Sequence, residues 1–154
     1  MTISQTLIDK VAESQFQGMP DWQVADVLNA VDLSFPLVKK DVSTADAKEI
    51  LLGNGDWASV VLTANNNSEP DQIKGACIVL RDTILHTTVV RTTVPDILLQ
   101  TQTVLAALVA ASVITQASRD ALLALTERPV SWAEHNNLFP VTARDVGLAR
   151  GGVA

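Results

Sequence analysis

The sequence predicts an all-α fold of six to eight short helices with one or two extended segments, arranged as a single helical domain over residues 1–154. Three Pro-Asp pairs, at residues 20–21, 70–71 and 95–96, each precede an apolar pattern of helical spacing. Proline suits the first turn of a helix because its missing N–H is not needed there, and the carboxylate that follows favours the positive end of the helix dipole. A pair of Ser/Thr-x-x-Glu/Asp patterns near the C-terminus predicts two further helix starts.

Four helices are expected in the first part of the chain, over residues 4–14, 21–30, 44–52 and 56–64. The second of these has only a narrow polar stripe and is expected to be largely buried. Ser43 with Asp46 resembles a capping box for the third helix, and Asp56 is a candidate cap for the fourth.

Three more helices are expected over residues 70–86, 96–111 and 115–125. The first should bury Ile73, Cys77, Val79, Leu80 and Ile84. The second is apolar almost all round in its second half, which indicates a helix enclosed by protein, and the domain centre is favoured over a subunit interface.

Three segments lack a helical period. The polar run at residues 65–68 predicts an exposed loop and is the candidate boundary inside the fold. Residues 31–42, "VDLSFPLVKKDV", suit an extended segment or a short edge strand. Residues 87–94, "TTVVRTTV", are β-branched except at Arg91 and favour a strand or an extended linker.

The composition restricts the choice of partners. The chain is 47% hydrophobic and only 18% charged, which indicates either apolar surface covered by a partner or a monomer surfaced by neutral polar side chains. The net charge of −6 argues against nucleic acid, because phosphate neutralisation requires clustered Lys and Arg. The N-terminal residues lack the basic flank and apolar run of a signal peptide. The longest uncharged run, residues 97–118, has too short an apolar part to span a membrane.

No catalytic, cofactor-binding or metal-binding residue is predicted. His86 and His135 have no ligand at metal-site spacing around them, and Cys77 lies among apolar neighbours as a small buried hydrophobe would. The "GNGD" run at residues 53–56 lacks the rest of a phosphate-binding motif and predicts a turn. We therefore expect a protein that is not an enzyme and has no small-molecule substrate.

The C-terminal helical pair at residues 131–150 has the outline of a DNA-reading helix-turn-helix. Ser131 with Glu134 and Thr142 with Asp145 form its two predicted capping boxes. Two hypotheses fit this stretch. In one, a small DNA-binding regulator contacts DNA through Thr142, Arg144 and Arg150. In the other, the pair is a folding unit that packs its apolar side chains on the preceding helix, and these side chains are Leu138, Val141, Val146 and Leu148.

Two stretches carry a family resemblance: "FQGMPDWQVADVLNA" at residues 16–30, and "VLAALVAASVITQASRDALLALTERPVSWAEHNNLFPVTARDVGLAR" at residues 104–150. Together they resemble a group of small uncharacterised proteins encoded in tailed-bacteriophage genomes, commonly near structural genes. The resemblance leaves residues 31–103 unmatched. Ser112 replaces the helix-ending glycine of that group, and His135-Asn136-Asn137 replaces its "ELG", where Asn137 can still adopt a left-handed conformation.

The resemblance implies a phage product that is part of the virion and is assembled in the cytoplasm of the bacterial host. The expected function is that of a non-enzymatic structural protein, in the tail or baseplate or at a fibre attachment, with a capsid cement or head-to-tail connector as the alternative. Its expected partners are other virion proteins and copies of itself, with no membrane and no cofactor. The candidate interface residues are Val89, Val90, Val94, Leu98 and Leu99, in or beside a segment that could pair as a strand across subunits.

Overall fold

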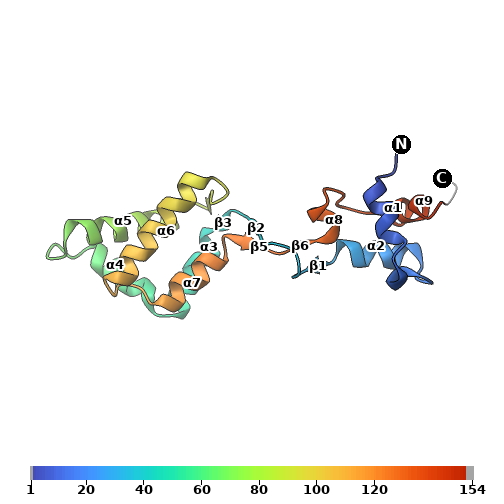
Figure 1. Cartoon of the computed structure of the whole chain (residues 1–154). Coiled ribbons are helices and arrows are strands. Elements are labelled where there is room, and N and C mark those ends of the chain that lie inside the picture. The colour runs from blue at the N-terminus through green and yellow to red at the C-terminus, as the bar shows by residue number, and fades with distance from the viewer. Residues whose placement is uncertain (1, 152–154) are drawn as a thin grey trace. The chain divides into compact units, whose positions relative to one another are not determined.

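The computed structural model describes residues 2–151. Within this range the chain forms nine α-helices, one short 3-10 helix and six strands of two residues each (Figure 1). The fold is therefore mostly helical, as predicted, but the expectation of a strictly all-α fold with six to eight helices is corrected. The extended segments pair with one another as three short two-stranded ladders, of which β1–β6 and β3–β4 are antiparallel, because their backbone N–H and C=O groups need partners that no helix supplies.

The chain divides into two compact units. Unit 1 comprises Met1–Val38 together with Pro129–Ala154, and unit 2 comprises Lys39–Arg128. The sequence suggested a single domain with a candidate boundary at residues 65–68, whereas the structure divides the chain at residues 38–39 and 128–129. Residues 65–68 form an exposed loop inside unit 2, between two of its helices.

Unit 1 is built from the two ends of the chain. Its elements are α1 (Gln5–Val11), the 3-10 helix η1 (Ser14–Phe16), α2 (Asp21–Asn29), β1 (Val31–Asp32), β6 (Val130–Ser131), α8 (Trp132–His135) and α9 (Ala143–Ala149). Its core joins both segments through the buried side chains of Leu7, Val11, Phe16, Val24, Ala25, Leu28, Ala133, Val141, Val146 and Ala149. The C-terminal helical pair thus packs on α1 and α2, and the expectation that it packs on the helix preceding it in the chain is wrong.

Both predicted capping boxes of the C-terminal pair are confirmed. The Ser131 hydroxyl accepts from the backbone N–H of Glu134 at 3.1 Å, and the Glu134 carboxylate accepts from the backbone N–H of Ser131 at 3.2 Å. Thr142 and Asp145 repeat the arrangement at the start of α9. Asn137 adopts the left-handed conformation, with φ of 58°, that the turn requires.

The carboxamide of Asn29 joins the end of α2 to the C-terminal segment. Its Nδ2 donates to the carbonyl oxygen of Val141 at 2.7 Å, and its Oδ1 accepts from the backbone N–H of Val141 at 2.9 Å. These two hydrogen bonds satisfy the backbone N–H and C=O of the buried Val141, as a neighbouring strand would. They join residues that are 112 positions apart in the sequence.

The guanidinium of Arg150 makes a second connection between the chain ends. It donates to the carbonyl oxygens of Phe16 at 2.7 Å and Met19 at 2.8 Å, and to the carboxylate of Asp21 at 2.6 Å. Gly147 allows α9 to approach this carboxylate, because a Cβ there would lie 2.9 Å from Oδ2 of Asp21. Arg150 therefore holds the loop between α1 and α2 against the end of α9.

Unit 2 consists of five helices and short strands. Its elements are β3 (Val42–Ser43), α3 (Thr44–Gly53), α4 (Asp56–Ala64), α5 (Asp71–His86), β4 (Val89–Val90), α6 (Pro95–Ala110), α7 (Gln116–Ala124) and β5 (Glu127–Arg128), and β2 (Val38–Lys39) precedes them and pairs with β5. Helix α5 packs on α3, α4 and α6, and α7 packs on α3 and α6. The β-branched run at residues 87–94 contributes only β4, where Val90 pairs with Val42 and Val89 with Ser43.

Several expectations about burial are wrong. In α2, Trp22 is 61% exposed and Val27 is 46% exposed, so this helix buries one face only. In α5, Val79 is 54% exposed although the pattern placed it in the core. Among the described residues of helix α6 only Leu105 and Leu108 are buried, so the favoured position at the domain centre is wrong, and the alternative of a subunit interface stays a prediction. Apolar side chains that the sequence assigned to the interior thus remain on the surface of both units.

Two predicted caps are also wrong. Ser43 occupies the N-cap of α3, but its side chain makes no capping hydrogen bond and the box with Asp46 does not form. Gly55 is the N-cap of α4, with φ of 77°, and Asp56 is the first residue of the helix. Glycine adopts this left-handed conformation without strain, and the cap lies one residue before the predicted Asp56.

We predict that Arg150→Ala destabilises unit 1 by about 1–3 kcal/mol, because it removes three hydrogen bonds of a charged donor. Urea unfolding measures the loss of stability, and hydrogen exchange of α2 and α9 localises it. Arg144→Ala is the matched control on α9: Arg144 is exposed, and the change should stay within about 0.5 kcal/mol. Equal effects of the two substitutions would contradict the role given to Arg150.

Candidate functional site

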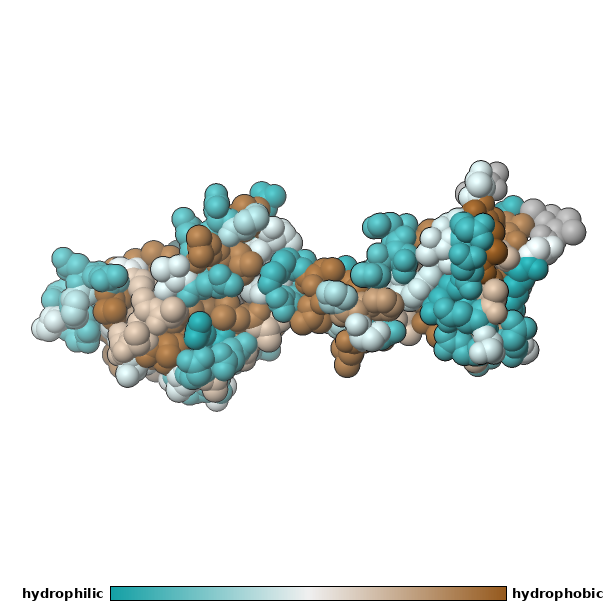
Figure 2. Space-filling model, viewed as in Figure 1, coloured by the Kyte–Doolittle hydropathy of each residue, from teal (hydrophilic) through white to brown (hydrophobic). Residues whose placement is uncertain are grey.

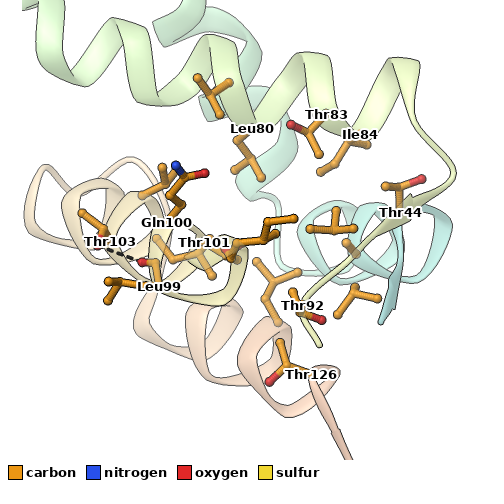
Figure 3. Close-up of a pocket in the computed structure, with 18 residues that line it drawn as sticks. Thr44, Leu80, Thr83, Ile84, Thr92, Leu99, Gln100, Thr101, Thr103 and Thr126 are labelled. Carbon is orange, nitrogen blue, oxygen red and sulfur yellow. Dashed lines mark hydrogen bonds between the residues drawn. The ribbon is translucent and has the colours of Figure 1, made fainter. Parts of the chain in front are cut away.

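An open apolar pocket in unit 2 is the candidate functional site (Figure 3). Its volume is about 650 Å³. Four helices and the β3–β4 pair line it, with Leu80, Thr83 and Ile84 projecting from α5 and Leu99, Gln100 and Thr101 from α6. The remaining lining residues are Val42, Thr44, Ala47, Val79, Val90, Thr92, Ile97, Thr103, Val104, Leu105, Leu122 and Thr126. We call this feature the unit 2 groove.

The floor and the rim of the unit 2 groove differ in exposure. Ile84, Leu105 and Leu122 belong to the buried core of unit 2 and form apolar floor. Val79 and Leu99 also line the groove, but they are 54% and 62% exposed. Large aliphatic side chains therefore stand at the mouth of the groove in contact with solvent, and burying them against a partner would be favourable.

Five of the six threonines that line the groove donate their hydroxyls to backbone carbonyl oxygens. Thr101 and Thr103 donate to the carbonyl oxygens of Ile97 and Leu99 one turn earlier in α6, at 2.8 and 2.9 Å. The hydroxyls of the buried Thr44, Thr92 and Thr126 each donate to a backbone carbonyl oxygen at 2.6 Å. The polar atoms of these side chains are thus already satisfied without a ligand.

No side chain that lines the groove is titratable. General acid–base catalysis, nucleophilic attack by a thiolate and metal ligation all require groups of a kind that this lining does not contain. The arrangement suits the burial of an apolar partner and gives no support to bond-making or bond-breaking chemistry.

A buried polar cluster in unit 2 also resembles a catalytic group. The carboxylate of Asp56 accepts from the backbone N–H and the hydroxyl of Thr115, both at 2.8 Å, and Asn54 donates to the hydroxyl of Ser118 at 2.9 Å. Burial alone would raise the pKa of Asp56, but hydrogen bonds from Ser118 and Thr115 outweigh it and hold that pKa below its ordinary value. Asp56 and Ser118 are both buried, so a substrate has no access.

The absence of a metal site stays a prediction. In residues 2–151 no group of three or more His, Cys, Asp or Glu side chains could hold a metal ion. Burial and the charge of Glu69 raise the pKa of the Cys77 thiol, which keeps it protonated and unreactive. His135 stacks on Phe35 with ring centroids 4.6 Å apart. Over the same range, no helix is long and apolar enough to cross a membrane.

The five candidate interface residues fall in or beside the unit 2 groove. Val90 and Leu99 line it, one from β4 and the other from α6. Val89 is 49% exposed at the neighbouring position of β4, and Val94 and Leu98 are half-buried near the start of α6. The sequence missed the rest of the groove because the lining residues come from six separate elements and show no common periodicity.

The three candidate DNA contacts are less available than their sequence suggested. The guanidinium of Arg150 is engaged with Asp21 and two backbone carbonyls, and the hydroxyl of Thr142 donates to Asp145. Only Arg144 has no interaction in the part of the chain that the structure describes. Unit 1 as a whole contains three basic residues and seven acidic ones, so its charge repels phosphate.

We predict that Asp56→Asn destabilises unit 2 by about 1–3 kcal/mol at pH 7, since a neutral amide is a weaker acceptor for Thr115 and Ser118. The lowered pKa means that this stabilisation is complete above the ordinary carboxyl pKa and is lost as the pH falls through the folded-state pKa. The difference from wild type should therefore shrink below about pH 4.

Urea unfolding between pH 7 and pH 2.5 measures this difference. Asp46→Asn, at an exposed position of α3, is the control and should change stability by less than about 0.5 kcal/mol. A difference between wild type and Asp56→Asn that stays constant down to the lowest pH would refute the role given to the carboxylate.

Comparisons with known proteins add no family to these observations. No protein-family model, no curated protein and no solved structure matches the chain.

Proposed function

We propose that the chain is a non-enzymatic assembly protein and that the unit 2 groove binds an apolar segment of a protein partner. The observation that carries the proposal is the apolar lining, with exposed Val79 and Leu99 at its mouth and no titratable side chain in it. A pocket built for a small polar substrate would place polar groups toward that substrate. This groove instead directs five threonine hydroxyls to its own backbone.

The surface of unit 2 supports a protein partner over a small enclosed ligand. Beyond the groove rim, Val89 and Leu85 are 49% and 50% exposed. Figure 2 shows apolar surface spread over the part of the chain that carries α3 to α7. A ligand enclosed in the groove would leave this outer apolar surface in water, whereas a protein would cover both.

We further propose that the particle assembled is a bacteriophage virion. The support is the resemblance of residues 16–30 and 104–150 to small proteins of tailed phages. Those stretches supply α2, α7, α8 and α9, whose residues provide most of the core of unit 1 and the two capping boxes. Most of the groove lining comes from residues 31–103, outside the resemblance, which is where contacts with a particular partner would be expected.

Within the virion we favour the tail or baseplate region, including fibre attachment, and a capsid cement or head-to-tail connector is the alternative. Both roles use the same physical act, the burial of apolar surface between protein subunits. The DNA-binding alternative has no specific observation in its favour, because the acidic balance of unit 1 and the engagement of Arg150 both oppose it.

We expect density-gradient-purified particles of the phage that encodes this chain to contain it at fixed stoichiometry. Leu99→Lys places a charge at the groove rim, where it must be desolvated when the partner binds, and should lower incorporation at least about tenfold. Quantitative mass spectrometry of the particles measures the stoichiometry.

Leu62→Lys is the matched control, because Leu62 is 71% exposed on α4 and does not line the groove. Incorporation of this variant should equal that of wild type. Particles that lack the chain altogether would overturn the virion proposal, and equal incorporation of the Leu99 and Leu62 variants would overturn the role of the groove.

A further inference from the structure

An exposed apolar turn in unit 1 has no role in the core of that unit. Residues 32–35 form a β-turn, in which the backbone N–H of Phe35 donates to the carbonyl oxygen of Asp32 at 3.3 Å. Leu33 stands at the second position of this turn and is 80% exposed, and Leu37 follows at 52%. Figure 2 shows brown, apolar surface over the segment between β1 and β2. We call residues 33–37 the apolar turn.

The apolar turn is held in one conformation by three contacts. The carboxylate of Asp32 accepts from the backbone N–H of Ser34 at 2.9 Å, and β1 pairs with β6 immediately before the turn. Phe35 stacks on His135 of α8 with ring centroids 4.6 Å apart, which ties the middle of the segment to unit 1. Leu33 is therefore presented to solvent on an ordered support, so little conformational entropy is lost when it binds.

Folding does not explain the apolar side chain at this position. The second position of a β-turn favours proline and accepts polar residues, and a solvated leucine there contributes no burial. Val31, Leu37 and Val38 are also exposed, at 60%, 52% and 37%, and a run of exposed apolar side chains of this kind indicates a contact with another molecule.

We propose that the apolar turn of one copy docks in the unit 2 groove of a second copy. This inference rests on the proposed function, since it names the occupant of the same groove. The groove lining has no titratable side chain, and Leu33 and Leu37 are aliphatic; the charge of the turn is the Asp32 carboxylate, which accepts from the backbone N–H of Ser34. An apolar cavity of about 150 Å³ holds a benzene-sized group, so the groove has room for both leucines.

A second copy is favoured over an unrelated partner because each copy exposes both halves of the contact. The turn of one copy and the groove of the next are different surfaces, so the contact is heterologous. Such contacts close into rings or continue as open chains of subunits. The contact is small, and we expect a Kd of roughly 10 µM to 1 mM, with assembly in a particle reinforced by repetition.

Sedimentation velocity of the full chain from about 20 µM to 1 mM tests the proposal over the expected range of Kd. Wild type should show reversible association that grows with concentration. Leu33→Ser removes the turn's contact and Leu99→Lys blocks the groove, and each should weaken association at least about tenfold. Leu62→Lys is the control and should associate as wild type does.

Mixing the two defective variants gives a sharper result. The Leu99→Lys copy keeps its turn and the Leu33→Ser copy keeps its groove, so an equimolar mixture should form 1:1 dimers and nothing larger. Circular dichroism confirms that each variant is folded. If Leu99→Lys is not folded, Val79→Lys on the same rim replaces it.

The proposal is overturned by a wild-type chain that stays monomeric throughout this range, by an equal loss in the Leu62 control, or by a mixture that forms no dimer. These failures are distinct from failure of the proposed function. If the chain is monomeric but present in virions, the apolar turn is rejected as the occupant of the groove and the assembly role stands. If the chain self-associates but is absent from virions, the virion role is rejected and docking of the apolar turn stands.

Discussion

The guanidinium of Arg150 is the contact on which the closure of unit 1 depends. The chain leaves this unit at residue 38 and returns at residue 129, so α1 and α2 are far from α8 and α9 in the sequence. Arg150 reaches across 134 positions to the carbonyl oxygen of Phe16 and across 129 positions to Asp21. Together with the carboxamide of Asn29, it satisfies backbone groups of one segment with atoms of the other, and the shared apolar core can then exclude water.

Unit 2 is organised in a different way, around the starts of two helices. Asp56 begins α4 and accepts hydrogen bonds from Thr115, the residue that caps α7. A carboxylate is favourable at the positive end of the α4 dipole, and Thr115 caps the neighbouring helix with the same hydroxyl that donates to Asp56. Elsewhere in unit 2 the apolar groove lies among α3, α5, α6, α7 and the β3–β4 pair.

Local features of the sequence predicted much of the local structure, although the caps expected at Ser43 and Asp56 do not form. The capping boxes at Ser131 and Thr142, the helix starts at the three Pro-Asp pairs and the left-handed Asn137 follow from interactions within four residues, which a sequence pattern contains. The division into two units was not predictable in the same way, because it depends on which segments meet across more than 90 positions. The exposure of Trp22 and Val79 was not predictable for the same reason. The sequence pattern shows which face of a helix is apolar, but distant parts of the chain decide whether that face is covered. For the candidate site, Val90 and Leu99 were predicted as interface residues from apolar character alone, and the groove around them was not.

The discontinuity of unit 1 also has a consequence for the order of folding during synthesis. Residues 39–128 contain every helix that unit 2 requires and are synthesised before the C-terminal segment, so this unit does not need that segment in order to fold. Helices α1 and α2, made first, must wait with Leu7, Val24 and Leu28 unburied until α8 and α9 emerge. For that interval the apolar side chains of α1 and α2 are exposed to aggregation, and unit 1 completes its core only after its C-terminal segment is made.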